Sequence, residues 1–121
     1  MCAVTQRLSM SDRAARELAD IFRLMGDASR LRIILACMER PICVGDIARA
    51  TKLSPSLVSH HLRLLRGARV LRGLRAGRQV FYAAADDHVR HMIRDMVAHV
   101  GEPREEPAPG RGRSKAERLR R

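Results

Sequence analysis

Aromatic residues are scarce in this chain, which has no Trp, two Phe and one Tyr. Proteins that bind single-stranded nucleic acid stack the bases on aromatic side chains, so this scarcity argues against that class. No apolar run approaches the roughly 20 residues of a membrane span, and the first residues lack the basic-then-apolar pattern of a signal peptide. The three cysteines, Cys2, Cys37 and Cys43, form neither a disulfide framework nor a CxxC zinc site. We therefore expect a cytoplasmic protein without a membrane partner.

Positive charge dominates what is present, since 24 Lys and Arg side chains stand against 13 Asp and Glu, a net charge of +11. Such an excess favours a polyanionic partner, because each neutralised phosphate releases condensed counterions. The 45% hydrophobic content of the 121 residues is enough for one packed core. We expect a flexible N-terminal arm at residues 1–10, one folded domain at residues 11–102 and a disordered basic tail at residues 103–121.

Apolar spacing and capping residues predict a mainly α domain with a small β-hairpin wing. Helices are expected at residues 12–25, 28–38, 44–50, 55–66 and 86–100, and strands at residues 70–74 and 79–83. Ser54 is expected to cap the fourth helix, with Leu57, Val58, Leu62 and Leu65 facing inward. The third and fourth helices, joined by a three-residue turn and followed by a basic hairpin, predict a winged helix-turn-helix of order α-α-α-α-β-β-α.

In that motif the second helix of the pair enters the major groove of double-stranded DNA. A solvated helix and a charged turn would be the ordinary interpretation of its polar residues. Small polar and forked side chains at one end of a capped helix, together with paired Arg on a hairpin, favour DNA instead. The predicted DNA-binding residues are Ser56, Ser59, His60 and Arg63 on the helix and Arg75 and Arg78 on the hairpin.

The last helix carries two histidines that cannot bind the same metal ion within one chain. His88 and His99 are separated by about 16 Å along a straight helix, too far for one metal ion. If the helix pairs antiparallel with a copy of itself, His88 faces His99 and Asp86 faces Glu102, because both pairs centre near residues 93 and 94. Two imidazoles and two carboxylates make a four-coordinate set that suits Zn²⁺ or Co²⁺.

Each of these four residues also has an ordinary interpretation. Asp86 can simply cap the helix, the two histidines can be surface residues, and Glu102 lies beyond Gly101 at the end of the helix. Their common centre is what favours a metal site in a homodimer. His91 is interpreted mainly as a surface residue, although Ni²⁺ would favour an extra ligand such as its imidazole.

The chain resembles the ArsR/SmtB family of winged-helix metal-sensing repressors over residues 18–102. The matching stretches are GDASRLRII (26–34), ICVGDIA (42–48), LSPSLVSHHLRLLRGARVL (53–71) and RAGRQVFY (75–82), with Asp-x-His and His-x-x-Glu on the last helix. The resemblance implies a homodimer that binds an inverted-repeat operator when metal-free and releases it on binding zinc, cobalt or nickel. It also implies that Arg69 relays metal binding to the DNA-binding face.

Some relatives build a second metal site at the third helix, where this chain offers only one cysteine. Cys43 and Asp46, with help from Cys2, form that possible second site. Two alternatives to a metal-responsive repressor stay open. One is a regulator of the same fold that answers a thiol signal through Cys37 and Cys43, or no signal at all. The other, a metal-dependent hydrolase, is disfavoured because no HExxH or compact His/Asp cluster exists, so we expect no enzyme.

Overall fold

The computed structural model describes residues 8–105. The elements in chain order are α1 (Asp12–Met25), α2 (Ala28–Ala36), β1 (Ile42–Cys43), α3 (Val44–Thr51), α4 (Pro55–Gly67), β2 (Leu71–Ala76), β3 (Gln79–Ala84) and α5 (Asp87–Gly101). Most of the expected N-terminal arm and basic tail, including Cys2, lies outside the described residues. Across the described part, no helix has the length and apolar character that crossing a membrane requires.

Side-chain caps set the starts of four helices, and the cap predicted at Ser54 is one of them. In each case a Ser or Asp oxygen accepts a hydrogen bond from the backbone N–H three residues further on, which satisfies one of the free donors of the first turn. The caps are Ser11, Asp27, Ser54 and Asp86, which start α1, α2, α4 and α5. The beginnings of these helices are therefore local properties of the chain.

The helix-turn-helix consists of α3 and α4. Lys52 ends α3 with a left-handed backbone, at a φ of 61°, and reverses the chain within a few residues. Pro55 then occupies the first turn of α4, where its missing N–H leaves no hydrogen bond unmade. This local geometry confirms the predicted turn.

The sheet differs from the expected hairpin because it has a third strand in the described chain. Its strand order is β1-β3-β2, and β1 pairs antiparallel with β3 through Ile42 opposite Tyr82 and Cys43 opposite Phe81. Two residues are too few to show the alternation that identifies a strand in a sequence. The prediction missed β1 because only the free edge of β3 makes these residues a strand. β2 and β3 form the wing, with Gly77 in the turn at a φ of +64°.

The core lies between α2, α3, α4 and the sheet. Its fully buried side chains include Ile33, Ile34, Ile47, Val58, Leu62, Leu65 and Leu71. Two expectations are wrong here: α2 ends at Ala36 rather than residue 38, and Leu57 is 39% exposed rather than inward. His61 takes the inward position of α4 in place of Leu57.

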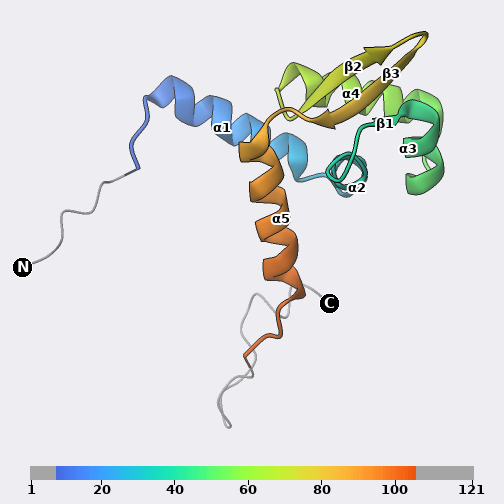
Figure 1. Ribbon diagram of the computed structural model, residues 1–121. Coiled ribbons are helices and arrows are strands. Elements are labelled where there is room, and N and C mark those ends of the chain that lie inside the picture. Colours follow the sequence, from blue (N-terminus) through green and yellow to red (C-terminus); the bar gives the residue numbers. More distant parts are fainter. Residues whose placement is uncertain (1–7, 106–121) are drawn as a thin grey trace, which may run out of the picture.

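α5 packs on this core through Ile93, its one buried residue, with Val89 and Met92 partly buried against the core. Figure 1 shows it running away from the sheet, on the side opposite the tip of the wing. The apolar side chains of its C-terminal half are exposed in the single chain, together with apolar residues of α1 and α2. This exposed apolar surface consists of Leu18, Phe22, Leu31, Leu35, Met96, Val97 and Val100.

Candidate DNA-binding surface and metal site

The outward face of α4 presents the predicted DNA-binding residues. Ser56, His60 and Arg63 are exposed, whereas Ser59 is half-buried. Their spacing of three and four residues places them on one face of the helix, opposite the buried Val58 and Leu62. The packing of α4 on the core therefore leaves a polar face free for a groove.

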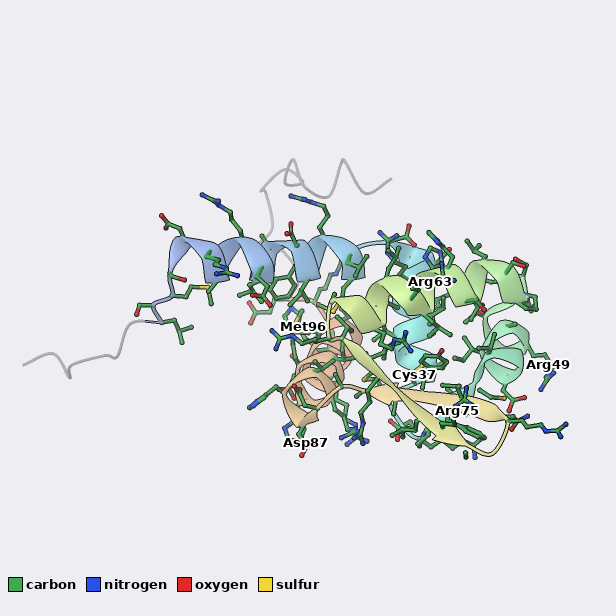
Figure 2. The ribbon with its side chains drawn as sticks, turned by 90° about the horizontal axis from the view of Figure 1, so that it is seen from above. Cys37, Arg49, Arg63, Arg75, Asp87 and Met96 are labelled. Atoms are coloured by element: carbon green, nitrogen blue, oxygen red, sulfur yellow. The ribbon has the colours of Figure 1, made fainter. Side chains whose placement is uncertain are left out.

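The wing carries the other two predicted residues. Arg75 lies at the end of β2 opposite Val80, and Arg78 lies in the turn, and both are exposed. Figure 2 shows Arg63 on α4 and Arg75 on the wing, both on the part of the molecule away from α5. The two basic elements are thus available to one duplex.

Two further basic residues border this surface and were not predicted. Lys52 is exposed in the turn before α4, close to the helix N-terminus, whose free N–H groups also attract phosphate. Arg66 reaches from α4 towards the wing: its Nη1 lies 3.8 Å from where a Cβ of Gly73 would stand. Gly73 is the feature of the sequence that could have identified Arg66, because a glycine inside a strand often marks the close approach of another group.

The four predicted metal ligands lie at the two ends of α5. Asp86 caps the helix through Oδ1, which accepts from the N–H of Val89 at 3.0 Å, and His88 follows it. At the other end the N–H of Glu102 donates to the carbonyl of His99 at 3.2 Å, which closes the last turn of the helix, and both residues line one surface hollow. All four side chains are exposed.

Two of these predicted ligands lie at each end of α5. His88 and His99 are about 20° apart around the axis of α5, so they share a face although they are far apart along it. Among residues 8–105 of one chain, no three His, Cys, Asp or Glu side chains are close enough to hold a metal ion. A four-ligand site would need a second copy of α5.

The possible second site is less complete. Cys43 is half-buried before α3, and Asp46 forms an ion pair with Arg49, which competes for its carboxylate. Cys2 lies outside the described residues. The described chain therefore places two of the three proposed donors near one helix start, with one of them already engaged.

Cys37 lies fully buried in the core, at 0% exposure. Burial disfavours the charged thiolate and raises the pKa of Cys37 to about 12. Because the thiolate is the reactive form, this environment argues against Cys37 as a sensor of oxidants or metals.

Arg69, the predicted relay, follows α4 with a left-handed backbone at a φ of 60°. Its Nη2 lies 2.7 Å from Oε1 of Glu17 on α1, and both side chains are largely exposed. Arg69 thus joins the end of α4 to α1 of the same chain.

A capped and exposed α4, preceded by the α3 turn and flanked by a basic wing, defines a winged-helix DNA-binding protein. The family described as "Bacterial regulatory protein, arsR family" matches residues 27–72. The transcriptional repressor SmtB homolog of Synechocystis sp. is 42% identical over 93 residues, covering 77% of this chain and 70% of that protein. The chain therefore belongs to the ArsR family, as the sequence indicated, and it is a DNA-binding transcriptional regulator rather than an enzyme.

Solved structures agree with the fold. The AntR antimony-specific transcriptional repressor is 27% identical with a TM-score of 0.67, over 83% of this chain and 95% of that one. A homodimeric winged helix-turn-helix domain, Mb0332 from Mycobacterium bovis, is 22% identical with a TM-score of 0.68, over 84% of this chain and all of that one. The second likeness supports the winged helix-turn-helix fold alone.

Proposed function

We propose that this protein is a metal-responsive repressor that binds an inverted-repeat operator as a homodimer and releases it when zinc, or chemically similar cobalt or nickel, binds. The names of two similar proteins point the same way, one being a transcriptional repressor and the other an antimony-specific repressor. The observation that carries the proposal is the placement of His88 and His99 on one face of α5, at opposite ends.

The exposed apolar surface supports the homodimer. Leu31 and Leu35 of α2 and Met96, Val97 and Val100 of α5, with Ile93, line a hollow that is almost entirely apolar. Contiguous apolar patches of this kind are rarely left open to water on soluble proteins and mark interaction sites. A second copy of α5 is the occupant that also brings the ligand pairs together.

The donor set fits a metal ion of the zinc type. Imidazole nitrogen and carboxylate oxygen are suitable donors for Zn²⁺ and Co²⁺. Asp86 retains a second carboxylate oxygen beside the one that caps the helix, so capping and ligation can coexist. A bound ion would cross-link the Asp86–His88 end of one α5 with the His99–Glu102 end of its partner.

The residues that would connect this site with DNA are those that join α5, α1 and α4. Leu18 and Phe22 of α1 are exposed as well, so the proposed dimer contact includes one face of α1. From α1, the Glu17–Arg69 ion pair reaches the end of α4. DNA and metal would favour different spacings of the two α4 helices. Each would therefore weaken the binding of the other by the same coupling free energy.

Titration of the metal-free protein with Co²⁺ tests the proposal. We expect tetrahedral absorption without a thiolate charge-transfer band, together with release of DNA from the region upstream of the protein's own coding sequence. His99→Ala should abolish both signals, whereas His91→Ala, an exposed residue of the same helix, should keep them. Thiolate charge transfer would contradict the ligand set, and unchanged DNA affinity on metal binding would contradict the response to metal.

A further inference from the structure

His61 is an anomaly on the DNA-facing helix. It lies on the inward face of α4 at 8% exposure, among Val58, Leu62 and Leu65, which are at most 1% exposed. Its Nδ1 is the one buried side-chain polar atom without a hydrogen-bond partner among the described residues. An unpaired buried polar group is unfavourable where an apolar side chain would pack without loss, so its presence calls for an explanation.

The surroundings of His61 disfavour a charged imidazole. Arg30 lies nearby, with its Nε donating to the carbonyl of Leu24 at 2.6 Å, at the junction of α1 and α2. Asp27 is the nearby opposite charge, but its Oδ2 already accepts from the N–H of Arg30 at 3.0 Å. The ring of His60 lies 5.7 Å from that of His61, between ring centres.

These groups lower the pKa of His61 below its usual value of 6.5. Burial is the main cause, Arg30 adds to it, Asp27 opposes it and His60 lowers it further. A proton on the buried Nδ1 would be a donor without an acceptor, because both ring nitrogens of a charged imidazole carry hydrogen. Protonation of the ring is therefore disfavoured while it keeps its place in the core.

We propose that His61 is a positioning residue that makes DNA affinity depend on pH: the neutral ring seats α4 against the α1–α2 junction, and the protonated ring displaces it. A displaced α4 no longer holds His60 and Arg63 at the surface that meets the groove. This inference rests on α4 as the DNA-facing helix, as proposed above, and is independent of the metal site.

The direction of the pH effect on DNA affinity follows from proton linkage. A histidine whose pKa is lowered in the folded protein binds its proton more readily when α4 is displaced, so the seated form loses stability as the pH falls through the histidine range.

The test is the affinity for a fluorescent duplex from the region upstream of the coding sequence, at constant salt and with a chelator, between about pH 5 and 8. Wild-type affinity should fall in acid by up to about tenfold for each unit by which the pKa of His61 is lowered. His61→Gln, which cannot titrate, should lose this fall.

Parallel pH profiles of wild type and His61→Gln would overturn the inference, and so would a His61 imidazole NMR signal that titrates at or above the usual histidine pKa. Arg63→Ala separates this failure from that of the DNA-binding surface. If Arg63→Ala weakens binding at every pH while the His61 profiles stay parallel, only the role of His61 is wrong. If Arg63→Ala leaves binding unchanged, α4 is not the DNA-facing helix and both proposals fail.

Discussion

Single histidines in this chain differ because of where the helices place them. His60 and His61 are adjacent in sequence, yet one is exposed on the outward face of α4 and the other is buried against α2. The spacing of Val58, His61, Leu62 and Leu65 is that of an inward helical face, so periodicity could have identified His61. Because histidine is polar, His61 was not assigned to the buried face of the helix, and Leu57 was assigned there instead.

A second residue, Ser54, should link stability and DNA binding, because its hydroxyl caps α4, the helix that carries the proposed DNA-binding residues. Ser54→Ala should lower the free energy of unfolding by about 1 kcal/mol and weaken DNA binding, since the first turn of α4 frays. Urea unfolding and the duplex assay measure the two effects. Ser11→Ala removes the same kind of cap from α1 and should lower stability while leaving DNA affinity nearly intact. Equal losses of DNA affinity in the two variants would contradict this role of Ser54.

Among the elements, α5 is attached to the rest of the chain by few contacts. Ile93 is its one buried residue. Two arginines of α5 contact the segment that follows α2: Arg90 Nε lies 3.4 Å from the carbonyl of Met38, and Arg94 pairs with Glu39 at 3.4 Å. Exposed ion pairs of this kind contribute at most about 1 kcal/mol. An element with so little intrachain burial is suited to be positioned by a partner.

The N-terminus of α5 allows capping and metal binding to be separated at Asp86. Asp86→Asn should preserve helix stability, because Asn caps as well as Asp, but should weaken Co²⁺ binding by removing a charged ligand. Asp86→Ala should reduce both. Thermal unfolding of the metal-free protein and Co²⁺ titration measure the two properties. Wild-type Co²⁺ affinity in Asp86→Asn would exclude the carboxylate as a ligand.

At the scale of the whole molecule, dimerisation is the step on which the proposed function depends. Within residues 8–105 one chain brings no three potential ligands close enough for a metal ion, and it leaves Met96, Val97 and Val100 exposed. Pairing two chains through α5 would bury the apolar residues and complete the metal site at once. The two α4 helices would then read the two halves of an inverted repeat.

Val97→Glu should therefore shift the protein towards monomers, because it places a charge in the apolar contact. Light scattering after size-exclusion chromatography measures the mass, and Co²⁺ absorption and DNA binding should be lost together. Ala98→Glu adds the same charge to the same helix outside the apolar stripe and should remain dimeric. A Val97→Glu monomer that kept tetrahedral Co²⁺ absorption would show that the site forms within one chain.

Signals confined to a few neighbouring residues were enough to predict the starts of α1, α4 and α5, the turn before α4 and the basic wing. Caps, prolines and glycines act through hydrogen bonds and backbone angles within one turn, so their effect is the same in any fold. Contacts between distant segments determined the rest. β1 exists because β3 offers it an edge, His61 is buried because α4 packs on α2, and Arg69 meets Glu17 across 52 positions. These features depend on which surfaces meet in three dimensions, and helical or strand periodicity in the sequence does not determine which surfaces these are.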